Sequence, residues 1–401
     1  MKEVTTIRGD AGRFRQDVMD RLRGRVREAI ELTIEEELTE LLGGDRYERT
    51  EGRRGYRNGS QERSVTTSMG QRALRLPRAR IAADDGTTRE FRSELLPRYA
   101  RRTREIDDAI LGIYLAGANS RRIRKALEPM LGSANVSKSA VSRIVGRLKA
   151  VFEAWSVRDL TTERYEVLYL DGFHLKVRLA RRVVSVPVLA VLGVAEDGTK
   201  VLVSLRLAAS EAAGQWSAVL VDLQKRGLSA PLVIVVDGHA GLQKALAEWP
   251  EVQVQRCARH KLVNLQEHCP THARAEMKRD YRKIINATDG ITARKAYDAF
   301  VAKWSKLCPA VARSIEEAGL ELLTFYTFPK AMWRALRTTN PLENLNREFR
   351  RRTKTQASFG REDAAVTLLY ALVAFGQIHM HKIDGHRDLK ALVAKRNIQA
   401  A

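Results

Sequence analysis

The chain has 401 residues and a formal net charge of +22, because 70 Lys and Arg stand against 48 Asp and Glu. This excess of cations indicates a polyanionic partner. Nucleic acid is favoured over a membrane surface, because the basic residues are spread along the whole chain. A hydrophobic fraction of 44% excludes wholesale disorder. Three cysteines are too few for a disulfide framework, and the first ten residues lack the apolar segment of a signal peptide. We therefore expect a soluble, cytoplasmic protein without a membrane partner.

Residues 1–44 are expected to form one long amphipathic helix. Apolar residues recur about every fourth position from Val18 to Leu42, and the pair Gly43-Gly44 supplies a stop signal. The apolar stripe is narrow and the other faces are charged. Two interpretations remain open: the helix packs against the rest of the protein, or it mediates dimerisation.

Residues 45–104 are predicted to form a basic β-hairpin region. Short alternating runs on both sides of Met69-Gly70 are typical of a hairpin with a glycine turn. Many arginines on a glycine-rich scaffold favour contact with phosphate groups, although a solvated basic surface has the same composition. The arginines around this hairpin are Arg53, Arg54, Arg57, Arg78, Arg80, Arg98, Arg101, Arg102 and Arg104.

Residues 105–155 are predicted to form a helix-turn-helix domain that binds DNA. The first helix is expected to end near Gly117, and Ser120 and Ser137 begin the next two. Pro129 is expected to end the second helix. The third helix has the apolar inner face and the polar, basic outer face that a recognition helix requires. The alternative is an ordinary three-helix packing unit. The residues expected to contact DNA here are Lys138, Ser142, Arg143 and Arg147.

Three acidic residues are predicted to form a metal site. Asp171 and Asp237 each stand at the C-terminal end of an apolar strand, and Glu343 lies in the first turn of a helix. Carboxylates brought together repel one another unless a cation neutralises them. Oxygen ligands suit Mg²⁺ or Mn²⁺, and two such ions in one active site can promote phosphoryl transfer. A single Asp at a strand end is ordinarily a cap or a turn residue, but three carboxylates in this order favour the metal site.

The order of predicted elements is that of a ribonuclease H-like fold: a meander of three strands, a helix, a strand, a helix, a strand and a helix with a carboxylate. The chain between Asp237 and Glu343 is too long for a minimal fold of this type, and its pattern is helical. We therefore predict a multidomain α+β protein. An N-terminal helical and helix-turn-helix region precedes a ribonuclease H-like α/β catalytic domain interrupted by an all-helical insertion. The segments are 160–265 and 338–385 for the catalytic domain, 266–337 for the insertion and 386–401 for a basic C-terminal tail.

Four segments together resemble the Mutator superfamily of DDE transposases, in its bacterial insertion-sequence branch. They are DGFHLKVR at 171–178, VDGHAGL at 236–242, QRCARHKLVN at 255–264 and RTTNPLENLNRE at 337–348. The resemblance extends over nearly the whole chain. One departure is Gly172, since the family usually has Ala beside the first Asp.

The resemblance implies that Asp171, Asp237 and Glu343 are the catalytic DDE triad. It further implies that the protein binds terminal inverted repeats, cleaves the element ends and joins the released 3′-OH to target DNA. Pairing of two double-stranded DNA ends implies a homodimer or a larger assembly, associated with the nucleoid when it is bound to DNA. Two alternatives are a structure-selective nuclease of the same fold without strand transfer, and a DNA-binding regulator with an inactive core.

The Cys-x-x-His pair of Cys257 and His260 has two interpretations. It supports the active site or the local structure, or it binds zinc together with His268, Cys269 and His272. His174 and His239 stand close to the triad aspartates, where they either contact scissile phosphates or donate hydrogen bonds to neighbouring groups. The residues expected to support the active site are His174, His239, Cys257, His260 and Asn340.

Basic residues near the triad are expected to contact the DNA backbone. Lys176 and Arg178 follow Asp171 on the same strand. Further basic residues recur every three or four positions after Glu343 on the predicted helix, so that they share one helix face. The alternative interpretation is a basic helix face that is only solvated, because such a face has the same pattern. The helical residues are Arg347, Arg350, Arg351 and Lys354.

Overall fold

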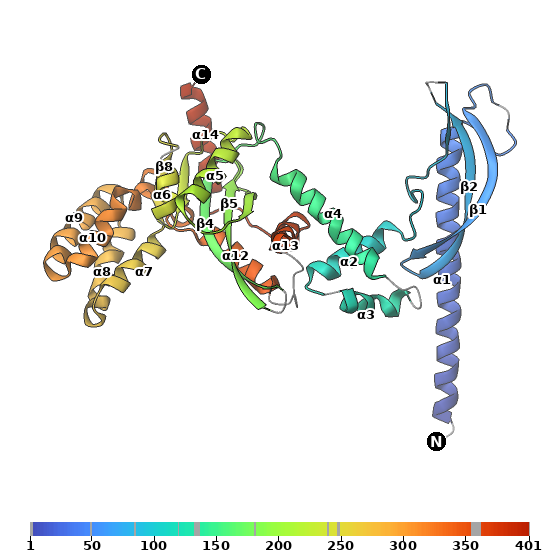
Figure 1. Ribbon diagram of the computed structural model, residues 1–401, viewed down its shortest axis with the longest axis horizontal. Coiled ribbons are helices and arrows are strands. Elements are labelled where there is room, and N and C mark those ends of the chain that lie inside the picture. Colours follow the sequence, from blue (N-terminus) through green and yellow to red (C-terminus); the bar gives the residue numbers. More distant parts are fainter. Residues whose placement is uncertain are drawn as a thin grey trace. The chain divides into compact units, whose positions relative to one another are not determined.

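The protein is a mixed α+β chain with two β-sheets, as predicted, and it divides into two compact units (Figure 1). The N-terminal unit extends to Val145 and the C-terminal unit begins at Gly146. Among the described helices, none is long and apolar enough to cross a membrane. The structure, a computed structural model, describes residues 3–48, 50–83, 86–118, 120–131, 137–179, 182–238, 240–246, 249–353 and 362–400.

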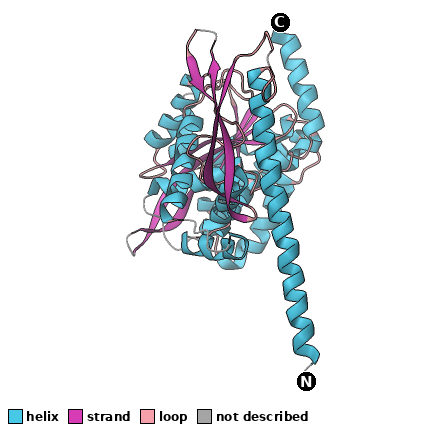
Figure 2. Ribbon diagram, turned by 90° about the vertical axis from the view of Figure 1, so that its right-hand side faces the viewer, coloured by secondary structure: helices cyan, strands magenta, loops and turns pink. Residues whose placement is uncertain are grey.

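The N-terminal unit begins with a single long helix, α1 (Glu3–Leu42), which is drawn end to end in Figure 2. It ends where Gly43 adopts a φ of +68°, a left-handed conformation that favours glycine. Ile34, Leu38 and Leu42 are buried, and the helix contacts strand β2 (Gly70–Ala82). The packing interpretation therefore holds for the part with these buried residues, and dimerisation through the remainder stays a prediction.

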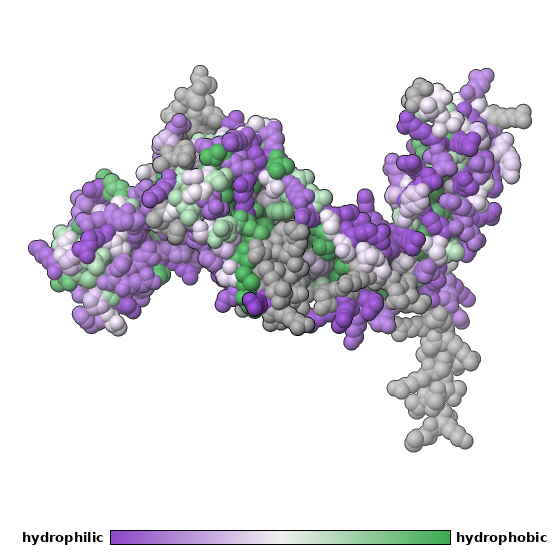
Figure 3. Space-filling model, viewed as in Figure 1, coloured by the Kyte–Doolittle hydropathy of each residue, from purple (hydrophilic) through white to green (hydrophobic). Residues whose placement is uncertain are grey.

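A three-stranded antiparallel sheet packs on α1. Strands β1 (Gly55–Thr67) and β2 (Gly70–Ala82) form the predicted hairpin, and β3 (Thr88–Glu90) pairs with β2. Val65, Leu74 and Leu76 join Ile34 in a common apolar cluster. Figure 3 shows mostly hydrophilic residues on the visible side of this sheet, so that the apolar side chains are on the helix side.

Three helices follow: α2 (Arg104–Leu115), α3 (Ser120–Leu131) and α4 (Lys138–Ser156). Their predicted apolar faces form one cluster that includes Ile106, Ile123 and Ile144. Ser137 caps α4, since its Oγ accepts a hydrogen bond from the backbone N of Ala140 at 3.2 Å. The prediction that Pro129 ends the second helix is wrong. The helix continues to Leu131, because a proline removes only one backbone hydrogen bond there and lies in the last turn.

The C-terminal unit is built on a five-stranded sheet with the order β6-β5-β4-β7-β8. The first three strands in sequence form the predicted antiparallel meander, and β7 and β8 run parallel to β4. Trp216, Leu220 and Leu223 of helix α5 pack into the core of the sheet. The elements are β4 (Val167–Leu179), β5 (Arg182–Val194), β6 (Lys200–Leu207), α5 (Ala213–Lys225), β7 (Val233–Val236), α6 (Ala240–Leu246) and β8 (Gln253–Arg256).

Residues 266–337, the predicted insertion, contain helices and no strand, and all of them are described by the structure. The end of this segment covers the edge strand β8. The Gln255 side chain donates to the carbonyl of Leu322 at 3.1 Å and accepts from the backbone N of Phe325 at 2.7 Å. These bonds connect the sheet edge to the end of the insertion. The α-helices from here to residue 336 are α7 (Ala258–His268), which begins before the predicted start of the insertion, α8 (Arg274–Ile285), α9 (Gly290–Leu307), α10 (Pro309–Ala318) and α11 (Trp333–Leu336).

Three helices complete the chain: α12 (Asn340–Thr353), α13 (Glu362–Ala374) and α14 (His386–Ala400). α14 occupies the segment that we predicted to be a basic tail. The prediction missed this helix because its apolar signal is sparse. Leu389 and Val393, four residues apart, are buried and lie on one helix face.

Candidate active site

Asp171 and Asp237 are neighbours because of the pairing register between β4 and β7. These parallel strands pair Leu170 with Val236, and each Asp is the next residue along its chain. The prediction that Asp171 stands at the end of its strand is wrong. β4 continues to Leu179 because β5 pairs with it along its whole length. Only the parallel pairing with β7 ends before Asp171, which leaves that edge open to the second carboxylate.

Asp171 is buried and surrounded by negative charge. Its side chain accepts a hydrogen bond from Asn346 Nδ2 at 2.9 Å, which connects β4 to α12. Burial, together with the charges of Asp237, Glu343 and Glu211, raises the pKa of Asp171 to about 7, although His260 acts in the opposite direction. Such a group has a strong tendency to bind a proton or a cation.

Glu343 lies in the first turn of α12, which packs on β4 through the stacked rings of Phe173 and Phe349. Its Oε2 accepts a hydrogen bond from Arg259 at 2.8 Å, and its Oε1 accepts one from Thr339 Oγ1 at 3.3 Å. The same Oε1 lies 3.7 Å from His260 Nε2. Glu343 is therefore held by cationic and hydroxyl groups on the side of α7.

The carboxylates fit a hard divalent cation. They supply the oxygen ligands that Mg²⁺ and Mn²⁺ prefer, and the raised pKa of Asp171 reports uncompensated negative charge. The ligand atoms of Asp171, Asp237 and Glu343 do not all lie within 4.8 Å of one another. Among the described His, Cys, Asp and Glu residues, the group whose ligand atoms all lie within 4.8 Å of one another is Cys257, His260 and Glu343.

Cys257 and His260 connect the start of α7 to the start of α12. The buried Cys257 Sγ accepts hydrogen bonds from the backbone N and the Oγ1 of Thr339, both at 3.4 Å. Burial raises the pKa of the Cys257 thiol, but hydrogen bonding and the charge of His260 outweigh it, so that the net pKa is lowered. The hydrogen bond between the side chains of Cys257 and His260 raises the pKa of His260 to about 9. His268, Cys269 and His272 do not join this group, which removes the larger zinc cluster.

Glu211 is a fourth acidic residue at the site, and we did not predict it. Its Oε1 lies 3.5 Å from Nδ1 of the exposed His174. A Cβ on Gly172 would come within 2.6 Å of the Glu211 carboxyl carbon, so that the glycine beside Asp171 leaves room for Glu211. His174 therefore contacts a carboxylate near the triad.

Other contacts at the site also went unpredicted, namely those of Arg259, Thr339 and Asn346. A spacing signal existed for Asn346, because it follows Glu343 by three residues and shares its helix face. Thr339 had a comparable signal, because it precedes Glu343 by four residues. Arg259 carried none, since its contact with Glu343 depends on the meeting of α7 and α12. Asn340, a predicted support residue, accepts a hydrogen bond from Arg259 at 3.3 Å.

The predicted DNA-contact residues that the structure describes are exposed on two helices and one strand. Ser142, Arg143 and Arg147 lie on α4, Lys176 lies on β4, and Arg347, Arg350 and Arg351 lie on α12. Arg350 also lies over the ring of Phe173 at 5.9 Å, and Arg351 pairs with Glu348 at 2.6 Å. His239, Lys354 and the side chains of Lys138 and Arg178 lie outside the described residues.

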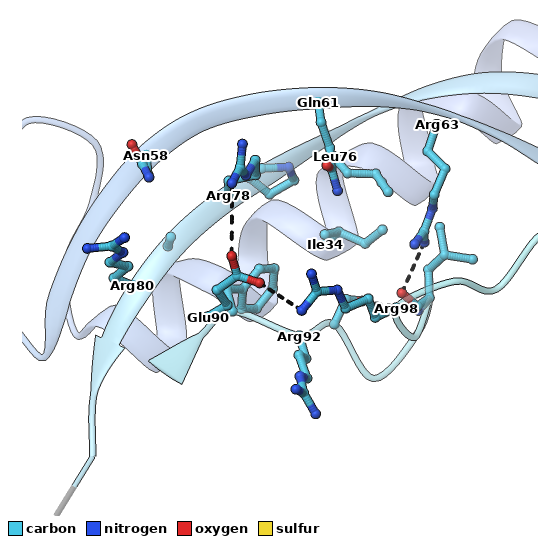
Figure 4. A pocket seen from close by; sticks show the side chains of 15 residues that line it. Ile34, Asn58, Gln61, Arg63, Leu76, Arg78, Arg80, Glu90, Arg92 and Arg98 are labelled. Atoms are coloured by element: carbon cyan, nitrogen blue, oxygen red, sulfur yellow. Dashed lines mark hydrogen bonds and ion pairs between the residues drawn. The ribbon is translucent and has the colours of Figure 1, made fainter. Parts of the chain in front are cut away.

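The N-terminal unit carries a second basic feature, a hollow of about 140 Å³ between β1, β2 and the segment after β3. Figure 4 shows Arg78 and Arg98 converging on the carboxylate of Glu90. Arg98 Nη1 lies 3.0 Å from Glu90 and Arg78 Nη2 lies 3.9 Å from it. The exposed Arg80 and Arg92 line the same hollow, which we name the arginine hollow.

Comparisons with known proteins agree with the resemblance seen in the sequence. A model of the Mutator family of transposases matches residues 2–380. The transposase for insertion sequence element ISRM5 of Rhizobium meliloti is 33% identical over 92% of this chain and 90% of its own length. The transposase for element IS406 of Burkholderia multivorans is 34% identical over 86% and 89%. The transposase for IS256 in transposon Tn4001 of Staphylococcus aureus is 30% identical over 85% and 86%. The chain therefore belongs to the Mutator family of transposases.

Proposed function

We propose that this transposase binds the terminal inverted repeats of an insertion sequence, cleaves the element ends and joins the 3′-OH to target DNA. The observation that carries the proposal is the meeting of Asp171 and Asp237 on adjacent parallel strands, with Glu343 close enough to raise the pKa of Asp171. The parallel and antiparallel order of the sheet supports a ribonuclease H-like catalytic domain. The common core of α2, α3 and α4 supports a helix-turn-helix domain.

Asp171, Asp237 and Glu343 would hold two Mg²⁺ or Mn²⁺ ions. When bound, such ions activate the attacking oxygen and stabilise charge on the leaving oxygen. Asn346 orients Asp171 through its hydrogen bond, and Thr339 and His260 hold Glu343. Arg259, whose side chain is 62% exposed, presents a positive charge beside Glu343 where a DNA phosphate can approach.

The reaction is two successive displacements at phosphorus. In the first, a water oxygen bonds to phosphorus while the bond to the 3′ oxygen breaks, and the departing oxygen becomes a 3′-OH. In the second, that 3′-OH attacks a target phosphodiester, whose own P–O bond breaks. Neither step uses a covalent protein–DNA intermediate, so that the chain's residues bind, orient and neutralise charge.

Three surfaces would hold the DNA. The exposed residues of α4 would read the inverted repeats, and the basic face of α12 with Lys176 would position the strand to be cut. The arginine hollow would bind backbone phosphates, because five of its lining residues are arginines and one is a carboxylate, Glu90. Binding two ends at once requires at least a homodimer.

Single substitutions of the triad test the proposal. Asp171→Ala, Asp237→Ala and Glu343→Ala should each lower cleavage of end-bearing DNA by about 10³-fold or more while binding is retained. Asp298→Ala is the control: it removes an exposed carboxylate of α9, and the variant should remain active. An active triad variant would remove that residue from the assignment. Adding target DNA separates transposase from nuclease, since cleavage without a joined product would indicate a nuclease.

A further inference from the structure

The group formed by Cys257, His260 and Glu343 differs in chemistry from the triad. Cys257 precedes α7, His260 lies in its first turn and Glu343 lies in the first turn of α12. Each residue offers one ligand atom, and these atoms all lie within 4.8 Å of one another. The set combines sulfur, nitrogen and oxygen, which is typical of sites for Zn²⁺ and related ions and unlike a magnesium site.

One ligand-to-ligand distance is that of a tetrahedral metal site. Ligand atoms bound to zinc at about 2.0–2.3 Å lie roughly 3.3–3.8 Å apart, and His260 Nε2 and Glu343 Oε1 are 3.7 Å apart. The second oxygen of Glu343 is held by Arg259, which keeps Oε1 on the side of the imidazole. Cys257 Sγ lies within 4.8 Å of the other two ligand atoms, so that the three side chains need to close by about 1 Å or less around an ion.

The sulfur is fixed in place and the site is open to solvent. Cys257 is fully buried, and its Sγ accepts two hydrogen bonds from Thr339. A metal-bound thiolate retains such hydrogen bonds, which orient the ligand. The side chains of His260 and Glu343 are 37% and 23% exposed. An ion can therefore enter from the solvent side and keep water as its fourth ligand.

We propose that Cys257, His260 and Glu343 bind a soft divalent cation such as Zn²⁺, and that the bound ion inhibits the transposase by occupying Glu343. The inhibition rests on the proposed function, because it requires Glu343 to be a ligand of the catalytic magnesium. The binding itself does not depend on that function. One carboxylate is then shared by two competing sites, one with oxygen ligands and one with sulfur and nitrogen.

Cobalt provides a direct optical test of the binding. Co²⁺ is titrated into the metal-free full-length protein, and a thiolate ligand produces a sulfur-to-cobalt charge-transfer band. The wild type should show this band, and Cys257→Ser should lose it. The chain contains two further cysteines as matched controls, so Cys269→Ser and Cys308→Ser should keep it. A band that survives in Cys257→Ser, or the lack of any band in the wild type, would overturn the site.

A second variant protects the test against misfolding of the buried Cys257→Ser. His260→Gln keeps the thiol and removes the imidazole, and it should bind Co²⁺ at least about tenfold more weakly. Mg²⁺ should not replace cobalt at the thiolate, because magnesium prefers oxygen ligands; its competition for Glu343 should only shift the cobalt titration to higher concentrations. Unchanged cobalt affinity in a folded His260→Gln protein would contradict the proposal.

The inhibitory effect is measured separately. Zn²⁺ is added to a cleavage reaction that contains Mg²⁺, and activity should fall over the zinc concentrations at which zinc binds, as determined by competition with cobalt at the same Mg²⁺ concentration. A zinc-selective chelator should restore it. Cobalt binding at Cys257 without zinc inhibition would overturn the inhibitory part and place the proposed role of Glu343 in doubt. Absence of cobalt binding would overturn the site and leave the proposed function intact.

Discussion

At the scale of single residues, Asp171 is placed where a carboxylate is costly for stability. It is buried beside three other acidic residues, and its pKa in the folded protein is about 7, above the ordinary value. Between about pH 4 and 7 the folded state binds more protons than the unfolded state. The metal-free protein therefore loses stability as the pH rises through this window, and a bound cation offsets the loss.

Asp171→Asn should remove this pH-dependent cost while it abolishes cleavage. In the presence of a metal chelator, the variant should have a higher Tm than the wild type at pH 8 and a similar Tm at pH 5. Each kcal/mol of stabilisation corresponds to about 2–4 °C in Tm. Thermal unfolding at both pH values provides the measurement. Asp298→Asn, in an exposed ion pair of α9, should show no such difference. Equal effects at the two pH values would contradict the assigned cause.

Gly172 and Gly193 should respond differently to a methyl group. At Gly172 an added Cβ would meet the end of the flexible Glu211 side chain at 2.6 Å, which can move aside. At Gly193 it would meet the ring of the buried Tyr165 at 2.6 Å and Val203 at 2.7 Å. Gly193→Ala should therefore cost about 1–3 kcal/mol and Gly172→Ala much less, as measured by denaturant unfolding. Similar losses at the two positions would show that Glu211 is rigidly held.

At the scale of elements, a cluster of buried cations attaches the insertion to the catalytic sheet. Arg256 and Lys261 are 1% and 2% exposed, and both pair with Glu317 on α10. Arg256 also donates to the carbonyl of Gly238 at 3.3 Å, one residue after Asp237. The insertion is therefore connected through Arg256 to the turn that holds the second carboxylate.

Glu317→Gln should destabilise the protein by roughly 1 kcal/mol, because it weakens the partner of two buried cations while the Glu317 side chain itself is 48% exposed. Glu316→Gln is the matched control. The neighbouring Glu316 is exposed, and this change should stay within about 0.5 kcal/mol. The free energy of unfolding in urea checks both variants. Equal stability of the two would mean that solvent compensates the buried cations.

Element boundaries were predictable to the extent that they depend on local pattern. The hairpin turn, the meander and the helical insertion follow from alternation, glycine placement and helical spacing. The helix α14 was not predictable in this way. Its burial depends on the partners of Leu389 and Val393, which lie elsewhere in the fold.

At the scale of the whole molecule, the charge of +22 predicts binding to DNA that weakens steeply with salt. Arg92→Gln, in the arginine hollow, should lower the slope of log affinity against log salt by about 0.9, the value for one phosphate contact. Glu90→Gln should instead raise affinity, because it removes the carboxylate between Arg78 and Arg98. Titrations at several salt concentrations measure both.

A control variant distinguishes the loss of a phosphate contact at Arg92 from the loss of one positive charge. Lys295→Gln removes the same charge from the exposed surface of the insertion, outside the proposed DNA surfaces, and it should leave the slope unchanged. Equal slopes for Arg92→Gln and the wild type would exclude the hollow as a phosphate site.

The sequence by itself determined the family, the mixed α+β class and the positions of the three carboxylates, because these depend on residue identity, spacing and local hydrophobic pattern. Only the tertiary structure decided which groups surround them. Glu211 and Arg259 reach the site from segments far from the three carboxylates in the sequence, and no local pattern encodes such a meeting. Thr339 and Asn346 belong to the same segment as Glu343, but Asn346 meets Asp171 only because α12 packs on β4. The pKa of Asp171 and the contact of Cys257 with Thr339 have the same origin, since burial and charge proximity are properties of the packed chain.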